Sequence, residues 1–442
     1  MPKRTASRRI WDLSATSIIY YSQYFVSSLW QSTSKAHPNT PLVVPYVLTA
    51  PFLGILGKKY GPNKVLPLMM LTFGICTLCV VGATNFSGLF AIRWFLGMSE
   101  SAFFPLVIYY QTTFYRRGEL ARRLAIFYAA QSIASAFGGL LAYGVFQVTT
   151  GPLANWRYLF LIEGCCTILF SFFAYWYLPR DASTASFFNA EEKELATQRM
   201  RIDSSSTVNE EFNLKDSLKI FKHWTSWAIV AIEICLGVPL QSVSLFLPQI
   251  IAKLGYSAVK TNLYTVAPNV GGAIMLLILA FSSDFTRLRF PFVAAGFAFT
   301  FIGFIVFSTV SITSPAAYFA CFLMTFGTSA PSVLLDVWYN NNIASENRRV
   351  VLTSIAVPLA NLMGVVSSNI FIANEAPKYT TALVTTAVFG ATGFVLTVLL
   401  GMYMIADNKK RDKAQGVKIH VRDVPTALLK EGPAVPEYRW FL

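Results

Sequence analysis

Long apolar stretches separated by short polar segments dominate the sequence. Such stretches carry few or no charges and predict membrane-spanning helices at 65–84, 87–111, 124–147, 157–178, 225–250, 262–281, 291–311, 316–338, 350–372 and 381–405. A helix rises 1.5 Å per residue, so about 20 residues cross the hydrocarbon layer of a bilayer. Two weaker stretches are 41–57, which is short and contains Pro45 and Pro51, and 13–34, which is rich in Ser, Thr and Gln. The pattern predicts an all-α membrane protein.

The spans fall into two halves around a polar segment. We expect an N-terminal bundle at 1–178, a central loop at 179–222, a C-terminal bundle at 223–406 and a solvated basic tail at 407–442. Weak internal similarity supports this division, because each half has a glycine, an aromatic pair and an Arg-Arg pair in the same order. These are Gly97, Tyr109-Tyr110 and Arg122-Arg123, then Gly327, Trp338-Tyr339 and Arg348-Arg349. Two such halves predict a carrier with a mid-membrane site between two six-helix bundles.

Composition narrows the class of protein. Of the 442 residues, 54% are hydrophobic and 13% charged, whereas soluble proteins carry about 25% charged residues. A cytosolic enzyme, a disulfide-rich module and a disordered regulator are excluded. The net charge of +14 comes from Lys and Arg in short gaps between apolar runs, so we expect contact with lipid and not with nucleic acid. The six cysteines lie inside apolar runs and predict buried thiols, with no metal and no cofactor.

The distribution of basic residues predicts orientation, because Lys and Arg in short loops resist translocation. One set of alternating loops carries eleven of them and the opposite set four. The first set is expected on the cytoplasmic side, together with the central loop and the tail. The larger set comprises Lys58, Lys59, Lys64, Arg116, Arg117, Arg122, Arg123, Arg287, Arg289, Arg348 and Arg349.

Ionisable residues inside the spans are candidates for function, since each costs about 2.5–3.5 kcal/mol on insertion scales. Arg93 and Glu100 are seven residues apart, which places them on one helix face with Gly97 between them. A guanidinium in low dielectric suits a carboxylate, sulfonate or sulfate, and a nearby carboxyl can carry a proton. The alternative is a structural ion pair that holds this helix to a neighbour.

Further candidates are weaker. Glu233 lies deep in the seventh span with no basic partner in the sequence, and Glu163 lies near Arg157 and fits an interface anchor as well. Tyr109 and Tyr110 could stack on a planar anion or belong to an aromatic belt. Several polar residues could reach the axis or simply join helices by hydrogen bonds: Gln131, Gln241, Ser242, Asn269, Asn361 and Asn369.

The stretch RWFLGMSESAFFPLVIYYQTTFYRRGELARR (93–123) resembles the anion:cation symporters of the major facilitator superfamily, and more closely their fungal allantoate-permease-like branch. The resemblance extends over residues 43–405. It includes KKYGPNKVLP at 58–67, NWRYLFLIEG at 155–164, SLFLPQIIAKLGYS at 244–257, NRRVVLTSIAVPLANLMG at 347–364 and EAPKY at 375–379.

The resemblance implies the major facilitator fold and proton-linked symport of a small anion such as nicotinate, allantoate, pantothenate or a sulfonate. Arg93 and Glu100 match the family's anion- and proton-binding residues on the fourth helix, and Gln131 and Asn361 match polar residues that face the cavity. Tyr109, Tyr110 and Gln241 are added as substrate contacts, and Glu233 as a second proton carrier.

The resemblance also marks two loops that lock the bundles together on the cytoplasmic side and favour the outward-facing state. The second-to-third loop motif remains as Gly54, Lys58, Lys59 and Gly61, without its acid. Its second-half counterpart is Ser283-Asp284 with Arg287 and Arg289.

Residues 1–40 do not match the long first helix with an Asp-Arg pair that family members usually have, so the first helix is expected to be atypical or incomplete. We therefore keep two hypotheses. The first is a monomeric secondary transporter of the plasma membrane that works by alternating access. The second is a transport-inactive paralogue or sensor of the same fold. The sequence contains no catalytic cluster and no filter-like loop, so neither an enzyme nor a channel is expected.

Overall fold

A computed structural model gives the fold. It describes residues 40–115, 119–146, 155–202, 213–252, 258–310, 315–371, 375, 379–418 and 432–442. The weak stretch at 13–34 and the expected atypical first helix lie outside the described residues. Within the described part the chain is helical and contains no strand, so the predicted all-α class is confirmed.

Each of the ten clear apolar stretches forms one helix or two helices in line. The short stretch around Pro45 and Pro51 is helical as well. The helices of the first half are α3 (Thr40–Tyr60), α4 (Pro62–Val81), α5 (Phe86–Glu100), α6 (Phe103–Thr112), α7 (Leu120–Phe146) and α8 (Asn155–Tyr177). Those of the second half are α11 (Trp224–Ala252), α12 (Ala258–Thr286), α13 (Phe290–Thr309), α14 (Pro315–Ser329), α15 (Pro331–Asn342), α16 (Glu346–Ile370) and α17 (Thr380–Gln415).

Nine helical segments of the described chain are long and apolar enough to cross a bilayer. Their outward faces carry large apolar side chains such as Phe172, Trp176 and Phe285, which is what a lipid-facing surface requires. The central segment adds two short helices and one turn of 3-10 helix: α9 (Ala190–Ile202), α10 (Leu214–Leu218) and η3 (Lys219–Lys222).

The described chain forms two compact units whose limits differ from the predicted domains. Unit 1 comprises the chain up to Val107 and Phe127–Lys193, and unit 2 comprises Ile108–Ile126 and Glu194–Leu442. Segment Ile108–Ile126 joins unit 2 because its polar groups bond there, as described below. α17 continues as a helix past residue 406 to Gln415 and ends at Gly416, whose φ of 68° suits a glycine C-cap.

Small residues allow the helices of unit 1 to approach closely. A Cβ on Gly164 of α8 would lie 2.7 Å from the Leu78 side chain of α4, and one on Gly74 would lie 3.0 Å from Thr167. Gly61 lies between α3 and α4 and is the N-cap residue of α4. Its φ is 93°, a value that residues with a side chain rarely adopt, so glycine suits this turn. These glycines fix the packing of the scaffold that carries Arg93.

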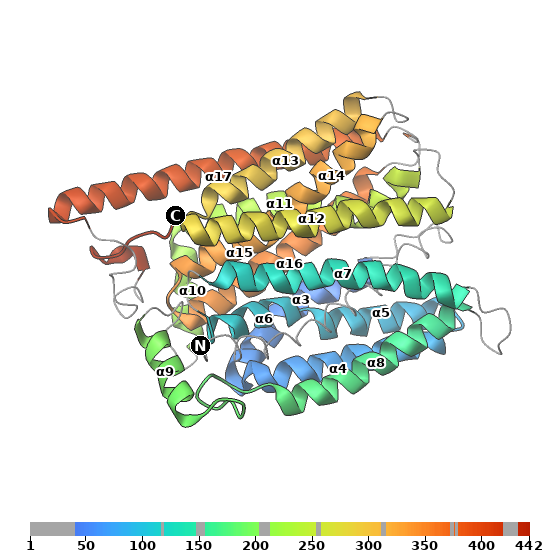
Figure 1. Cartoon of the computed structure of the whole chain (residues 1–442), viewed down its shortest axis with the longest axis horizontal. Coiled ribbons are helices and arrows are strands. Elements are labelled where there is room, and N and C mark those ends of the chain that lie inside the picture. Colours follow the sequence, from blue (N-terminus) through green and yellow to red (C-terminus); the bar gives the residue numbers. More distant parts are fainter. Residues whose placement is uncertain are drawn as a thin grey trace. The chain divides into compact units, whose positions relative to one another are not determined.

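Unit 2 packs α11 against α16 and α17, and α13 against α14 and α17. α17 is the longest helix and runs on past the end of α13 (Figure 1). On α11, a Cβ on Gly237 would lie 2.2 Å from the Ala360 carbonyl oxygen of α16, so the two backbones touch at that point. Such contacts are the usual way in which membrane helices associate.

We expect Gly237→Ala to destabilise unit 2, because the methyl group meets backbone atoms that cannot rotate away. Overpacking of this kind costs about 1–3 kcal/mol. Gly82→Ala is the matched control, since the nearest atom to its added Cβ is 3.7 Å away and its φ is −88°. Thermal denaturation of the purified proteins should show a midpoint several degrees lower for Gly237→Ala only. Equal midpoints would contradict the backbone contact.

The sequence predicted a solvated tail at 407–442, but the last part of the chain is packed against unit 2. Residues Gly432–Leu442, the C-terminal strap, fold back onto unit 2, and Tyr438, Arg439, Trp440 and Phe441 are buried. The Phe441 carbonyl accepts from Trp338 Nε1 at 3.0 Å and from Asn342 Nδ2 at 2.9 Å, while Phe441 N donates to Asn342 Oδ1 at 2.8 Å. The strap therefore belongs to the folded core of unit 2.

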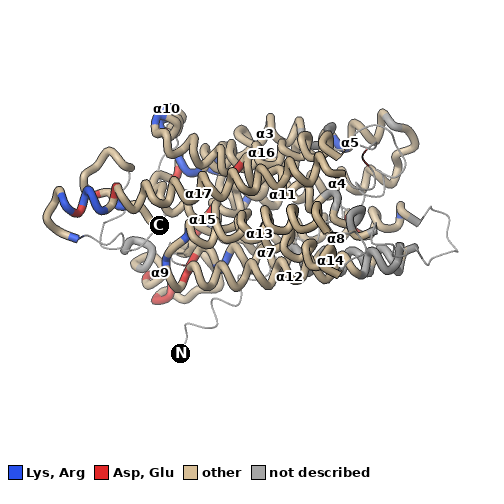
Figure 2. Tube along the Cα trace, turned by 90° about the horizontal axis from the view of Figure 1, so that it is seen from above, with Lys and Arg blue, Asp and Glu red and all other residues tan. Residues whose placement is uncertain are grey.

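Charged residues gather where the strap docks. We call this region the Arg-rich end of unit 2, and it contains Arg122, Arg289, Arg348, Arg349 and Arg439. Figure 2 shows charged positions at α10 and on the far part of α17, whereas α11, α13 and α14 are drawn almost entirely uncharged. Arg348 pairs with Asp216 of α10 at 3.1 Å. A hydrogen bond from Lys219, helped by Arg348, holds the pKa of Asp216 below its ordinary value.

Candidate functional site

Arg93 and Glu100 both lie buried on α5 in unit 1. Arg93 is 9% exposed and Glu100 6% exposed, and the charge of each acts on the other. The helix begins at Asn85, whose side chain accepts from Gly88 N at 2.9 Å and caps the first turn. The seven-residue spacing then brings both groups to one buried side of α5.

The membrane span that carries these groups is interrupted directly after Glu100. α5 ends there, and α6 begins at Phe103, so the apolar segment Ser87–Thr112 consists of two helices. Pro105 explains the break, since it has no N–H to donate to the carbonyl of Ser101. The Ser101 hydroxyl accepts from Thr49 of α3 at 2.9 Å. Glu100 thus sits at a helix end, where irregular backbone is tolerated only inside protein or beside a cavity.

The guanidinium of Arg93 has no hydrogen bond and no salt bridge to the described residues of unit 1. Glu100 acts on it through charge, without a direct ion-pair contact among those residues. A guanidinium presents five donors in a planar fork that matches a carboxylate or sulfonate. A buried cation without a counterion is unfavourable, so this geometry suits an anion that binds from outside the protein.

Two predicted substrate contacts meet in unit 2. Gln241 of α11 donates through Nε2 to Asn361 Oδ1 of α16 at 2.8 Å. Both side chains are half-buried, and Gly364 follows on α16 next to Gln241. Two amides held by one hydrogen bond form a fixed polar patch on otherwise apolar helices, which can orient a ligand.

The other polar candidates have bonds that hold helices. The Ser242 hydroxyl donates to Ser367 at 3.1 Å, linking α11 to α16, and Ser367 donates to the Val238 carbonyl. Asn269 and Asn369 each donate to a carbonyl of their own helix. The side chain of Gln131 on α7 lies outside the described residues.

Tyr109 and Tyr110 are buried at the end of α6 that belongs to unit 2. The Tyr109 hydroxyl donates to Glu346 Oε2 of α16 at 3.3 Å. The Tyr110 ring packs edge-on against Phe114, with centroids 4.9 Å apart. The Tyr109 hydroxyl is therefore bonded to the carboxylate of Glu346, which belongs to the same unit.

Glu233 lies on α11 with a second carboxyl beside it that sequence reasoning missed. Asp336 of α15 is the charged group that acts on Glu233, and both are buried. Tyr339 donates a short hydrogen bond to Asp336 Oδ1. The rule that singled out Glu233 applies equally to Asp336, because Asp336 falls inside the expected span 316–338.

A family model described as the Major Facilitator Superfamily matches residues 30–368. The chain belongs to the Major Facilitator Superfamily. Its members move small molecules across membranes, so this chain is an integral membrane transport protein.

Known members of the superfamily resemble the chain to different degrees. Uncharacterized transporter C1039.04 of Schizosaccharomyces pombe is 52% identical over 401 residues, covering 90% of this chain and 79% of that protein. The high-affinity nicotinic acid transporter of Saccharomyces cerevisiae is 28% identical over 83% of this chain and 68% of its own length. The solved proton:xylose symporter XylE matches with a TM-score of 0.65 at 16% identity, over 90% of this chain and 94% of that one, which shows the shared fold.

The segment that the sequence matched to the superfamily's second-to-third loop motif joins α3 to α4 and lies within the described residues. Gly54 is buried on α3, Lys58 is half-buried, and the ammonium group of Lys59 lies 5.6 Å from the Tyr60 ring centroid. Gly61 closes the turn, with its N–H donating to the Gly57 carbonyl at 3.0 Å.

The second loop of the superfamily pattern centres on Asp284. Its Oδ1 pairs with Arg289 at 2.6 Å, and its Oδ2 accepts from Arg122 N at 3.0 Å. Arg287, the arginine chosen from the motif, is exposed and has a φ of 62°. Burial lowers the pKa of Arg289, and the Asp284 carboxylate opposes this effect. Asp284 thus ties segment Ile108–Ile126 to the Arg-rich end.

Proposed function

We propose that this superfamily member is a secondary transporter that carries a small anion together with a proton by alternating access. The observation that supports the proposal is the buried guanidinium of Arg93, which has no ion pair among the described residues of unit 1. The similarity to the high-affinity nicotinic acid transporter of Saccharomyces cerevisiae supports a carboxylate as cargo. Carboxylates, sulfonates and sulfate share the geometry that a guanidinium recognises.

In this proposal Arg93 binds the anion and Glu100 carries the proton. Glu100 is buried on the same helix, so its protonation state changes the field at Arg93 directly. Gln131, Gln241 and Asn361 orient the anion, Tyr110 lines its path, and Glu233 is a second proton carrier. Tyr109 is proposed as a further substrate contact, whose hydroxyl also donates to Glu346 Oε2 at 3.3 Å.

We also propose a plasma-membrane location, a monomeric protein and a cytoplasmic Arg-rich end. Two loops that the charge pattern assigned to one side support this proposal, since Arg122 and Arg289 both bond Asp284. Excess Lys and Arg favours the cytoplasmic side. The contacts support a common side for these loops, and labelling of single cysteines in intact cells would identify that side.

The test of function is uptake into proteoliposomes with an imposed inward proton gradient. Labelled nicotinate, allantoate, a sulfonate and sulfate are offered separately, with xylose as the neutral control. Accumulation of one anion that ends when a protonophore is added supports the proposal. Uptake of xylose alone, or binding of an anion without flux, would reject it, and the second result would favour a sensor.

We expect Glu100→Gln to lose accumulation driven by the pH gradient while keeping exchange of labelled for unlabelled anion. A gradient of one pH unit can drive about tenfold accumulation at one proton per anion, and this factor should fall to about one. Glu163→Gln is the matched control, because Glu163 is also a buried carboxyl of unit 1, on α8. If Glu100→Gln still concentrates the anion, Glu100 is not the proton carrier.

A further inference from the structure

The core of unit 2 contains a helix whose described residues are all buried although many are polar. α15 carries Asp336, Tyr339, Asn340, Asn341 and Asn342, and each is at most 9% exposed. Buried polar groups persist when they are hydrogen-bonded or when they serve a function. The two asparagines at 340 and 342 have partners, since Asn340 donates to the Asp336 carbonyl and Asn342 holds the strap.

The carboxyls of Glu233 and Asp336 are different, because they lie on packed helices, act on each other through charge and have no ion pair with a cation among the described residues. Glu233 is 3% exposed and Asp336 2% exposed. No hydrogen bond from the described residues reaches Oε1 of Glu233. The carboxyl of Asp336 receives one hydrogen bond from the described residues, which comes from the Tyr339 hydroxyl. An unpartnered carboxylate oxygen in the interior requires either a positive charge or a proton.

Among the described residues, the helices of unit 2 that pack against α11 and α15 have no positive charge in their middle parts, and α13 has no acidic or basic side chain at all. Within the described residues, α14 contains no acidic or basic side chain, and α17 contains none before Asp407. α12 carries Asp284 at its end, bonded to Arg289 and Arg122. α16 places its charges in the first turn, where Glu346, Arg348 and Arg349 contact Tyr109, Asp216 and the Ile343 carbonyl respectively. Deeper on α16, Thr353 offers only a hydroxyl, which donates to Asn340 Oδ1 at 3.4 Å.

We propose that Glu233 and Asp336 share one proton and form a protonation site in unit 2, distinct from Glu100 in unit 1. Two carboxyls this deeply buried cannot both be ionised when no cation faces them, since like charges in a poorly hydrated site repel strongly. One proton between them leaves a single negative charge, and Tyr339 donates a hydrogen bond to it. Proton binding here does not depend on the cargo, whereas its link to flux rests on the proposed function.

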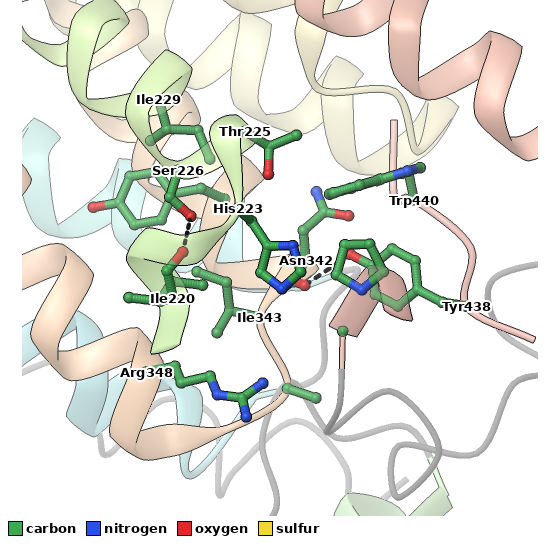
Figure 3. A pocket seen from close by; sticks show the side chains of 14 residues that line it. Ile220, His223, Thr225, Ser226, Ile229, Asn342, Ile343, Arg348, Tyr438 and Trp440 are labelled. Atoms are coloured by element: carbon green, nitrogen blue, oxygen red, sulfur yellow. Dashed lines mark hydrogen bonds between the residues drawn. The ribbon is translucent and has the colours of Figure 1, made fainter. Parts of the chain in front are cut away.

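A route for the proton leads to the Arg-rich end. Tyr339 lines a cavity of about 40 Å³ together with His223, Ser226, Asn342 and Tyr438. Figure 3 shows the His223 and Asn342 side chains beside the strap residue Tyr438, whose hydroxyl donates to the Asn342 carbonyl at 2.9 Å. A space of this size with several polar groups on its wall can hold water. Tyr339 lines this space and also donates to Asp336 Oδ1, so it connects the cavity to the carboxyl pair.

Infrared difference spectroscopy on the purified, reconstituted protein tests the site through the C=O stretch of protonated carboxylic acids. Wild type should titrate this pair in two separate steps, because the first proton changes the affinity for the second. Glu233→Gln and Asp336→Asn should each leave one step, and the double variant none. Glu100→Gln is the control, since it removes a different band and leaves both steps. A single common step in wild type, or an unchanged titration in Glu233→Gln, would overturn the proposal.

A third variant tests the route and remains informative if the carboxyl variants aggregate. Tyr339→Phe removes one hydroxyl and should slow hydrogen–deuterium exchange of the shared proton severalfold, without removing its band. The inference would be contradicted if the proton exchanged as fast in Tyr339→Phe as in wild type. It would also be contradicted if wild type showed no C=O band for a protonated carboxyl of this pair. Because the spectra need no transport, a failure of anion uptake leaves this result intact, and the two proposals can fail separately.

Discussion

Arg93→Ala should lower anion uptake by about 100-fold or more. Each hydrogen bond to a charged group contributes about 1.5–3 kcal/mol, and a bidentate guanidinium makes two of them. Since 1.4 kcal/mol corresponds to a factor of ten in affinity, loss of both bonds predicts at least about two orders of magnitude. Initial rates at low anion concentration in proteoliposomes measure the change.

The controls for this variant separate charge from shape. Arg93→Lys keeps the charge but loses the fork, so it should recover only part of the uptake. Arg180→Ala removes an exposed arginine outside the spans and should transport like wild type. Size-exclusion profiles of all variants check folding. Uptake at the wild-type rate in well-folded Arg93→Ala would remove Arg93 from the anion site.

Arg289→Ala should cause the largest loss of stability among the substitutions considered. The guanidinium is fully buried, pairs with Asp284 at 2.6 Å, donates to Ser283 Oγ at 2.9 Å and lies 5.4 Å from the Phe441 ring centroid. Removing one partner of a buried ion pair costs about 3–5 kcal/mol, because the other charge stays behind. For a unit of this size that corresponds to a fall of about 10 °C in the denaturation midpoint.

The neighbouring arginine is a close control. Arg287→Ala removes an exposed side chain from the same loop. The backbone at this position has a positive φ of 62°, which is equally unfavourable for arginine and for alanine, so the substitution adds no backbone strain. Its midpoint should stay within about 2 °C of wild type, as surface substitutions usually do. If Arg287→Ala proved the more damaging of the two, the ion pair at Asp284 would not be what stabilises the loop.

Sequence reasoning succeeded where one physical signal dominates. The apolar stretches gave the helices because a span must satisfy its backbone internally and face lipid with apolar side chains. Spacing along a helix was equally reliable for Arg93 and Glu100, since a seven-residue interval returns to the same side. Both depend only on local geometry and on the solvent.

Sequence reasoning failed where the partner is distant in the chain. Nothing local distinguishes Arg287 from Arg289, because the choice depends on which side chain turns inward to meet Asp284. The pairing of Glu233 with Asp336 joins two helices about a hundred residues apart, so no motif shows it. The break after Glu100 could have been predicted, since Pro105 removes a specific hydrogen bond. Roles in anion and proton binding stay predictions for all these residues.

The docking of the C-terminal strap has a consequence for biogenesis. Gly432–Leu442 come after all the long helices of the described chain, and the Leu442 carbonyl accepts from Arg289 N at 2.5 Å. A ribosome must therefore finish all the spans before Trp338 and Asn342 acquire their last partners. In chains truncated before Gly432, Trp338 and Asn342 should lack these partners, and amide hydrogen–deuterium exchange of α15 should be faster than in the chain that carries the strap.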